Sequence, residues 1–173
     1  FQNFLSRPSL HIISIHVFIF FLSLILLAAC SGEQSGFEPS GKLVKVGFLG
    51  PLSGEEKSLG ENSLAGAQVA LTLQPYLLNG DKVELVAIDD QGDPQLAKDA
   101  IDELLKETEI SSLLLGSPSS FVLSMVEYLD KKSIPAVALL ATHPDVTKGE
   151  SIIQLPCNDF QQGTVAALYV LDE

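Results

Sequence analysis

Basic residues are scarce in this sequence. Its 173 residues include 10 Lys and Arg against 22 Asp and Glu, which gives a formal net charge of -12. The single basic residue before position 30 is Arg7, and all the acidic residues lie after that position. A surface of this sign repels phosphate backbones and anionic lipid headgroups. We therefore expect neither nucleic acid nor a charged membrane surface as a partner.

Signatures of catalysis and of metal binding are also missing. His143 is the only histidine after the signal region, and one His without a Cys or Glu cluster is a poor metal site. There is no Ser-His-Asp grouping and no Gly-x-Ser-x-Gly elbow. Gly50–Gly54 lacks the spacing of a phosphate loop, so we interpret it as a turn that brings backbone near a ligand. We expect no enzyme, no cofactor and no metal.

An apolar run lies near the start of the sequence. Val17–Ala29 contains no charged residue, and Arg7 precedes it. A membrane-spanning helix needs about 20 apolar residues, whereas the core of a signal peptide needs roughly 7–15 and ends in small residues. We therefore predict a signal peptide over residues 1–29, although Leu10–Ile15 could extend the run into an uncleaved anchor.

The end of this run, Leu27-Ala28-Ala29-Cys30, resembles the lipobox of bacterial lipoproteins, in which the cysteine becomes the lipidated first residue. The alternative is an ordinary secretory cleavage site beside a chance cysteine. The resemblance implies lipidation at Cys30, and the Ser/Gly/Glu-rich residues 30–42 are typical of a flexible tether. Cys157, the only other cysteine, then has no disulfide partner within the sequence. We expect its thiol to be buried.

Beyond residue 42 the sequence alternates between apolar runs and amphipathic segments. The apolar runs predict five strands, at 42–50, 82–90, 112–116, 135–140 and 151–155. The amphipathic segments predict helices: one ends at Pro75, one covers Phe121–Lys131 and one begins near Phe160. Another begins at Asp93-Pro94, a pair typical of an N-cap followed by the first helical residue.

Polar side chains follow two of the predicted strands. Asp89 and Asp90 could form a metal or phospho-acceptor pocket, but an acidic turn that caps the next helix is the simpler interpretation. Ser117, Ser119 and Ser120 precede the helix that covers Phe121–Lys131. Their hydroxyl groups and the N–H groups of the helix N-terminus could hold a carboxylate. Capping of this helix by Ser119 or Ser120 explains the serines equally well.

Strands that are apolar throughout and that alternate with helices are typical of a parallel sheet covered by helices. The predicted fold class is therefore α/β, with a parallel sheet flanked by helices. In such sheets, ligands lie outside the carboxyl ends of the strands. We expect any site to be built from the loops at 50–60, 89–94, 116–120 and 140–145.

The order and spacing of these segments resemble the type 1 periplasmic binding proteins. The similarity is to their branched-chain amino acid (Leu/Ile/Val) group, the solute-binding proteins of ABC transporters, and it covers nearly all of residues 43–172. The main stretches are VKVGFLGPLSG (Val44–Gly54), ELVAIDDQGDPQLAKDAIDELL (Glu84–Leu105), LLLGSPSS (Leu113–Ser120), IPAVALLATHPDVT (Ile134–Thr147) and DFQQGTVAALYVL (Asp159–Leu171). The resemblance implies two lobes that close about a hinge over a small solute. Residues 43–155 correspond to the N-terminal lobe, and residues 156–173 to the start of a second lobe that we expect to be truncated.

The resemblance also implies site residues. In the family, the loop matching Ser119 and Ser120 and the stretch matching Leu140, Ala141 and Thr142 hold the α-carboxylate and α-ammonium groups of the ligand. We expect Ser119, Thr142 and the backbone of Leu140 to make these contacts here.

Two departures leave the identity of the solute open. The family often has an aromatic side chain that covers the ligand where Leu59 stands. It also tends to have a small residue where Leu140 stands, and a bulkier side chain there could narrow the pocket.

Two functions fit these observations. The first is a lipoprotein that binds an amino acid of branched-chain type, or a similar small amide or carboxylate. It would deliver this solute to an ABC permease, face the periplasm or the cell exterior, and contact the membrane through its lipid anchor only. The alternative is a sensor or scaffold lipoprotein of the same fold that binds a protein partner and regulates envelope processes.

Overall fold

The computed structural model describes residues 41–172. The predicted signal peptide and lipidation site at Cys30 therefore lie outside the described residues. The described part contains one five-stranded sheet, in the order β2-β1-β3-β4-β5, and all four neighbouring pairs are parallel. Its strands are β1 (Leu43–Gly50), β2 (Lys82–Asp89), β3 (Ser112–Leu115), β4 (Ala136–Ala138) and β5 (Ile152–Gln154). The predicted α/β class is confirmed.

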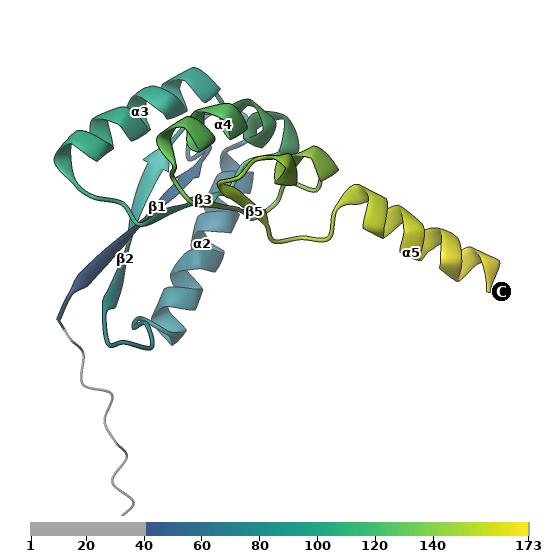
Figure 1. Ribbon diagram of the computed structural model, residues 1–173, viewed down its shortest axis with the longest axis horizontal. Helices are drawn as coiled ribbons and strands as arrows, with labels where there is room; N and C mark the ends of the chain where they lie inside the picture. Colours follow the sequence, from purple (N-terminus) through teal and green to yellow (C-terminus); the bar gives the residue numbers. More distant parts are fainter. Residues whose placement is uncertain (1–40, 173) are drawn as a thin grey trace, which may run out of the picture. The chain divides into compact units, whose positions relative to one another are not determined.

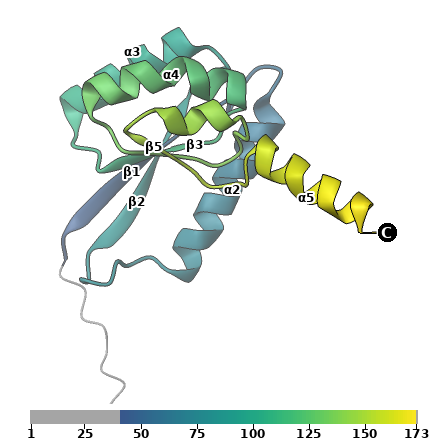
Figure 2. The same ribbon diagram turned by 45° about the vertical axis from the view of Figure 1, so that its right-hand side comes forward.

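The helices cover both faces of the sheet, as Figures 1 and 2 show. The helical elements are α2 (Lys57–Leu73), α3 (Pro94–Glu107), α4 (Ser119–Lys132), the 3-10 turn η1 (Pro144–Lys148) and α5 (Asp159–Leu171). α3 and α4 lie side by side on one face, and α2 lies on the other. The predicted start of α3 is confirmed, because the Asp93 side chain accepts hydrogen bonds from the N–H groups of Gln95 and Leu96.

The main core lies between the sheet and the α3–α4 face. Leu49, Leu113 and Leu115 of the strands pack there against Ile101 of α3 and against α4. α4 contributes a stripe at helical spacing, formed by Phe121, Val122, Met125 and Leu129. This stripe is the inward face that the apolar spacing of the sequence predicts.

α2 buries few of its residues against the other face of the sheet. Gly60 is its only buried residue, and a Cβ atom there would overlap the Pro51 backbone. The ring of Phe48, which is fully buried, fills the space that Gly50 and Gly116 leave open at the ends of β1 and β3. Leu73, near the end of α2, is 78% exposed.

α5 begins after a short connection from β5. Asn158 caps it, with a reciprocal hydrogen bond from the Asn158 N–H to the Gln161 side chain, and none of its residues is buried. The expectation of a buried Cys157 thiol was wrong, because Cys157 lies in this connection and is exposed. The connection leaves the core directly after β5, so it carries the thiol to the surface.

Candidate functional site

The strand order creates a crevice at the carboxyl edge of the sheet. The chain runs from β1 outward to β2, crosses back over β1 to β3, and then continues in the opposite direction to β4 and β5. The segments that follow β1 and β3 therefore lead to helices on opposite faces, α2 and α4. A change of direction of this kind is where open α/β sheets bind ligands.

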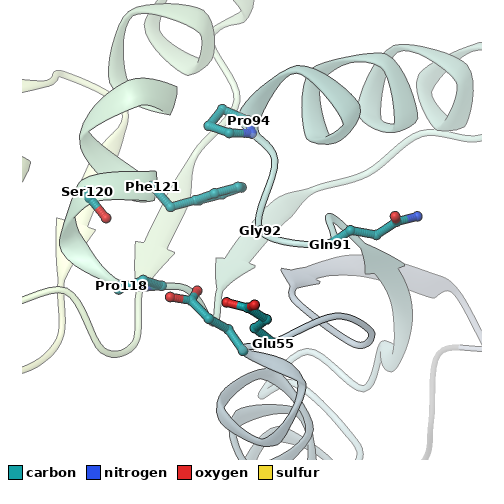
Figure 3. Close-up of a pocket in the computed structure, with 8 residues that line it drawn as sticks. Glu55, Gln91, Gly92, Pro94, Pro118, Ser120 and Phe121 are labelled. Atoms are coloured by element: carbon teal, nitrogen blue, oxygen red, sulfur yellow. The ribbon is translucent and has the colours of Figure 1, made fainter.

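A cleft of about 500 Å³ lies at this point. The residues that line it come from the loops after β1 and β2 and from the start of α4: Glu55, Glu56, Gln91, Gly92, Pro94, Pro118, Ser120 and Phe121. In Figure 3 the ring of Phe121 points from α4 toward Pro94 and the Gly92 turn, and Glu55 lies on the loop that enters α2. Two of the lining residues are acidic and none is basic, so the cleft favours a ligand that carries a positive charge.

Two aspartates fasten the loops behind this cleft. Asp89 accepts a hydrogen bond from the Leu52 N–H at 2.9 Å, which ties the loop after β1 to the end of β2. Asp90 is fully buried and accepts from the Gly92 N–H at 2.8 Å and from the Ser117 hydroxyl at 3.0 Å. The acidic turn therefore joins three loops, and the capping of α3 that we predicted for it belongs to Asp93.

The two carboxyl groups have opposite pKa shifts. Burial raises the pKa of Asp90 and outweighs its two hydrogen bonds, and the nearby charges of Asp89 and Glu56 act in the same direction. Burial also acts to raise the pKa of Asp89, but hydrogen bonds from the Ser53 hydroxyl and from three backbone N–H groups outweigh it and lower the pKa.

Asp90→Asn is expected to raise the thermal midpoint slightly at pH 7. A raised pKa means that the fold favours the neutral acid. The cost of burying the Asp90 charge is therefore present at pH 7 and disappears as the pH falls through the raised pKa. Asparagine removes this cost, and its amide can still accept from Gly92 and donate to Ser117. The rise should shrink toward pH 4, which thermal unfolding at several pH values will measure.

Asp89→Asn is the matched control, because it should change the thermal midpoint at pH 7 in the opposite direction. Its lowered pKa means that the carboxylate stabilises the fold above the ordinary Asp pKa, and that this contribution is lost as the pH falls through the lowered pKa. This substitution should lower the midpoint at pH 7, and its effect should shrink as the pH falls below the ordinary Asp pKa. The same sign of change for both variants at pH 7 contradicts the assignment.

Ser119 connects α4 to the loop after β4. α4 begins at Ser119 with Pro118 as its N-cap residue and has no side-chain cap, so the prediction that Ser119 or Ser120 caps this helix was wrong. The Ser119 hydroxyl oxygen instead accepts from the N–H groups of Thr142 at 3.1 Å and His143 at 3.2 Å. Tertiary contact with the neighbouring loop therefore replaces the local cap.

This arrangement fixes the direction in which Ser119 can donate. A hydroxyl oxygen accepts at most two hydrogen bonds, and both positions are taken by backbone N–H groups. The Ser119 hydroxyl hydrogen can therefore be donated to a further acceptor, such as a ligand atom. The first N–H groups of α4 have no partner within the helix, and their partial positive charge favours an anion. Together they form donors suited to a carboxylate.

The loop after β4 has carbonyl groups that could accept a hydrogen bond from a ligand. The Ala141 carbonyl accepts from the Gln154 side chain at 2.7 Å, and the Thr142 carbonyl accepts from the Asp159 N–H at 2.8 Å. Ala141 is fully buried with its side chain in the core, whereas Leu140 and Thr142 are half-buried. Within the described part of the chain, no group donates to the carbonyl of Leu139 or to that of Leu140, and Leu140 is the nearer of the two to Thr142 in sequence. That carbonyl is therefore suited to an ammonium group.

The structure brings together some of the predicted site residues and separates others. Ser119 and Thr142 are in contact, but of the predicted site residues only Ser120, one residue further on, lines the cleft; Ser119, Leu140, Ala141 and Thr142 lie beside it. Leu59 lies in the first turn of α2, is 37% exposed, and does not line this cleft.

Sequence reasoning missed Glu55, Glu56 and Gln154. The two glutamates lie in the loop at 50–60, which was predicted to form part of the site, so their position could have identified them. Gln154 acts on a loop that precedes it by 11–13 residues, and no sequence pattern indicates this contact.

Neither a metal site nor a membrane span is found in residues 41–172. No group of three His, Cys, Asp or Glu side chains is placed there to hold a metal ion. No helix of the same residues is long and apolar enough to cross a bilayer.

A parallel α/β lobe with an open polar cleft at the carboxyl edge has the architecture in which open α/β sheets bind ligands. Comparison with known proteins agrees, because residues 43–173 match the periplasmic binding protein family. The chain belongs to this family, and its sheet has the type 1 fold. Membership implies an extracytoplasmic location.

The relatives differ in what they bind. An amino acid binding protein of Pseudomonas aeruginosa is 32% identical over 75% of this chain and 36% of its own length. A leucine binding protein of Thermotoga maritima superposes with a TM-score of 0.64 at 24% identity, covering 73% of this chain and 36% of that one. A Rhodopseudomonas palustris solute binding protein in complex with p-hydroxybenzoic acid gives 0.63 at 23% identity, with 76% and 36% covered. The chain thus spans about a third of the length of the relatives it matches.

Proposed function

We propose that this chain is the first lobe of a solute-binding lipoprotein that delivers an amino acid to an ABC permease and catalyses no reaction. The contact between Ser119 and Thr142 carries the proposal. It places a donating hydroxyl, the uncapped start of α4 and the Thr142 side chain together at the carboxyl edge. A carboxylate fits these donors, and an ammonium group fits the Leu140 carbonyl. Residues 156–173 would lead into the second lobe, which closes over the solute.

The charge of the cleft supports an amino acid over an aromatic acid. p-Hydroxybenzoic acid, which the Rhodopseudomonas palustris protein holds, has a carboxylate and no ammonium group. In this chain Glu55 and Glu56 line the cleft without a basic neighbour in the lining. A ligand with a negative charge alone is repelled by them, whereas the ammonium group of an amino acid is attracted.

The lipid anchor and the permease are the remaining parts of the proposal. Leu27–Cys30 has the sequence of a lipobox, and Cys30 would carry the lipid that keeps the protein at the membrane surface. An anchored receptor outside the cytoplasm fits delivery of a solute to a membrane permease.

A thermal-shift comparison of leucine with 4-methylpentanoate, the same molecule without its ammonium group, tests the proposal on the full-length gene product. A ligand at a hundredfold excess over its dissociation constant stabilises by about 2.7 kcal/mol, which such a measurement resolves. We expect an amino acid to raise the midpoint and its des-amino analogue to raise it much less. Other amino acids, small amides and benzoates complete the panel.

Two substitutions locate the binding site. Ser119→Ala and Thr142→Ala should each reduce the affinity on the order of tenfold, because each removes a protein hydroxyl that hydrogen-bonds a charged group of the ligand. Thr72→Ala is the matched control. It removes an exposed hydroxyl that donates to the Gln68 carbonyl on α2, and it should leave the affinity for the solute unchanged. A well-folded protein that responds to no solute, or that responds equally to both members of the leucine pair, contradicts the proposal.

A further inference from the structure

Gln154 is the last residue of β5 and is half-buried. Its side-chain amide donates to the Ala141 carbonyl at 2.7 Å and to the His143 carbonyl at 3.2 Å. These carbonyls belong to the residues on either side of Thr142, so one amide group holds the 141–142 peptide unit and the 143–144 peptide unit. Because both partners are acceptors, the amide nitrogen must face them.

Thr142 is also held from two other directions. Its N–H group donates to Ser119 at the start of α4, and its carbonyl accepts from the Asp159 N–H at the start of α5 at 2.8 Å. The connection between β5 and α5 therefore touches the Thr142 loop at both of its ends, through Gln154 and through Asp159. A rotation of α5 relative to the sheet would act directly on the Thr142 carbonyl.

We propose that Gln154 is a positioning residue for solute binding. It ties the carbonyl groups of Ala141 and His143, the neighbours of Thr142 in the chain, to the end of β5, so that the loop keeps its orientation relative to the sheet while α5 moves. Ser119 then retains its two N–H donors, and its hydroxyl hydrogen stays directed at the solute. The role in binding rests on the proposed function, whereas the bracing of the loop does not.

Gln154→Met tests the proposal, because methionine keeps the unbranched shape and removes both hydrogen bonds. Gln95→Met is the matched control, since it also removes one side-chain amide bond, the exposed 2.9 Å contact with Asp99 on α3. In the absence of solute, amide hydrogen exchange at Thr142 and His143 should be faster on the order of tenfold in Gln154→Met and unchanged in Gln95→Met. Unchanged exchange in Gln154→Met overturns the proposal whether or not any solute binds.

Affinity supplies the second readout. For the solute that the wild type binds, Gln154→Met should raise the dissociation constant about tenfold, and the solute-free thermal midpoint should fall by the few degrees that the faster exchange implies. Gln154→Glu keeps the shape, lacks a hydrogen to donate at pH 7, and regains one when it is protonated. Its affinity relative to wild type should therefore recover as the pH falls through the pKa of the introduced carboxyl group.

The outcomes separate the two proposals. If the wild type binds no solute, the proposed function fails, and faster exchange in Gln154→Met alone still supports the brace. If the wild type binds a solute and Gln154→Met binds it equally well, Gln154 has no positioning role and the inference is wrong.

Discussion

Replacing Gly60 with alanine is expected to lower the free energy of unfolding by about 3 kcal/mol. A Cβ atom at this position would overlap the carbonyl group and the nitrogen of Pro51, which are backbone atoms of the loop after β1. Backbone cannot rotate out of the way as a flexible side chain can, so either the first turn of α2 or the loop must move. Urea unfolding followed by circular dichroism will measure the loss.

Gly66→Ala in the same helix is the matched control. No atom lies within 4 Å of a Cβ built at Gly66. Alanine is favoured over glycine inside a helix by roughly 0.5–1 kcal/mol, so this variant should be more stable than the wild type. If both glycine substitutions stabilise the protein, the close approach of α2 to Pro51 is not a feature of the fold in solution.

Replacing Phe48 with alanine should cost about 4 kcal/mol. The ring is fully buried between the sheet and α2, above the two glycines that end β1 and begin the loop after β3. It lies outside the large core between the sheet and the α3–α4 face, and no other aromatic ring in residues 41–172 is fully buried. Hydrogen exchange should show protection lost in α2 before it is lost in α4.

Leu73→Ala provides the comparison for Phe48. Leu73 lies on α2 but is 78% exposed, and its truncation should change stability by no more than about 0.5 kcal/mol. Equal losses of protection in α2 and α4 after Phe48→Ala would show that the ring supports the whole sheet rather than α2 in particular.

Much of the fold is readable from the sequence because its local patterns agree with one another. Five apolar runs became five parallel strands, and the Asp93-Pro94 pair begins α3 as its composition predicts. The errors occur where tertiary contacts override local preference. Ser119 is a good capping residue by type, but two backbone N–H groups of another loop occupy its oxygen. The exposure of Cys157 likewise depends on where the chain leaves the core.

The candidate site was predictable to the level of loops but not of hydrogen bonds. Parallel strands bring their carboxyl ends to one edge, so the proximity of Ser119 to Thr142 follows from the strand order once β3 and β4 are neighbours. Which carbonyl remains open depends on the contacts of Gln154 and Asp159, which join residues 11–17 positions apart around a turn. Those contacts depend on the exact path of the backbone, and composition carries no information about it.

The exposed Cys157 thiol gives the protein a natural attachment point for a reporter dye. It lies three residues after Gln154, in the connection whose two ends touch the Thr142 loop. In a Cys30→Ser variant it is the only thiol in the sequence, so an environment-sensitive fluorophore would label one position. Movement of α5 on solute capture would then change the emission intensity, and the labelled protein would serve as an optical sensor for its own ligand.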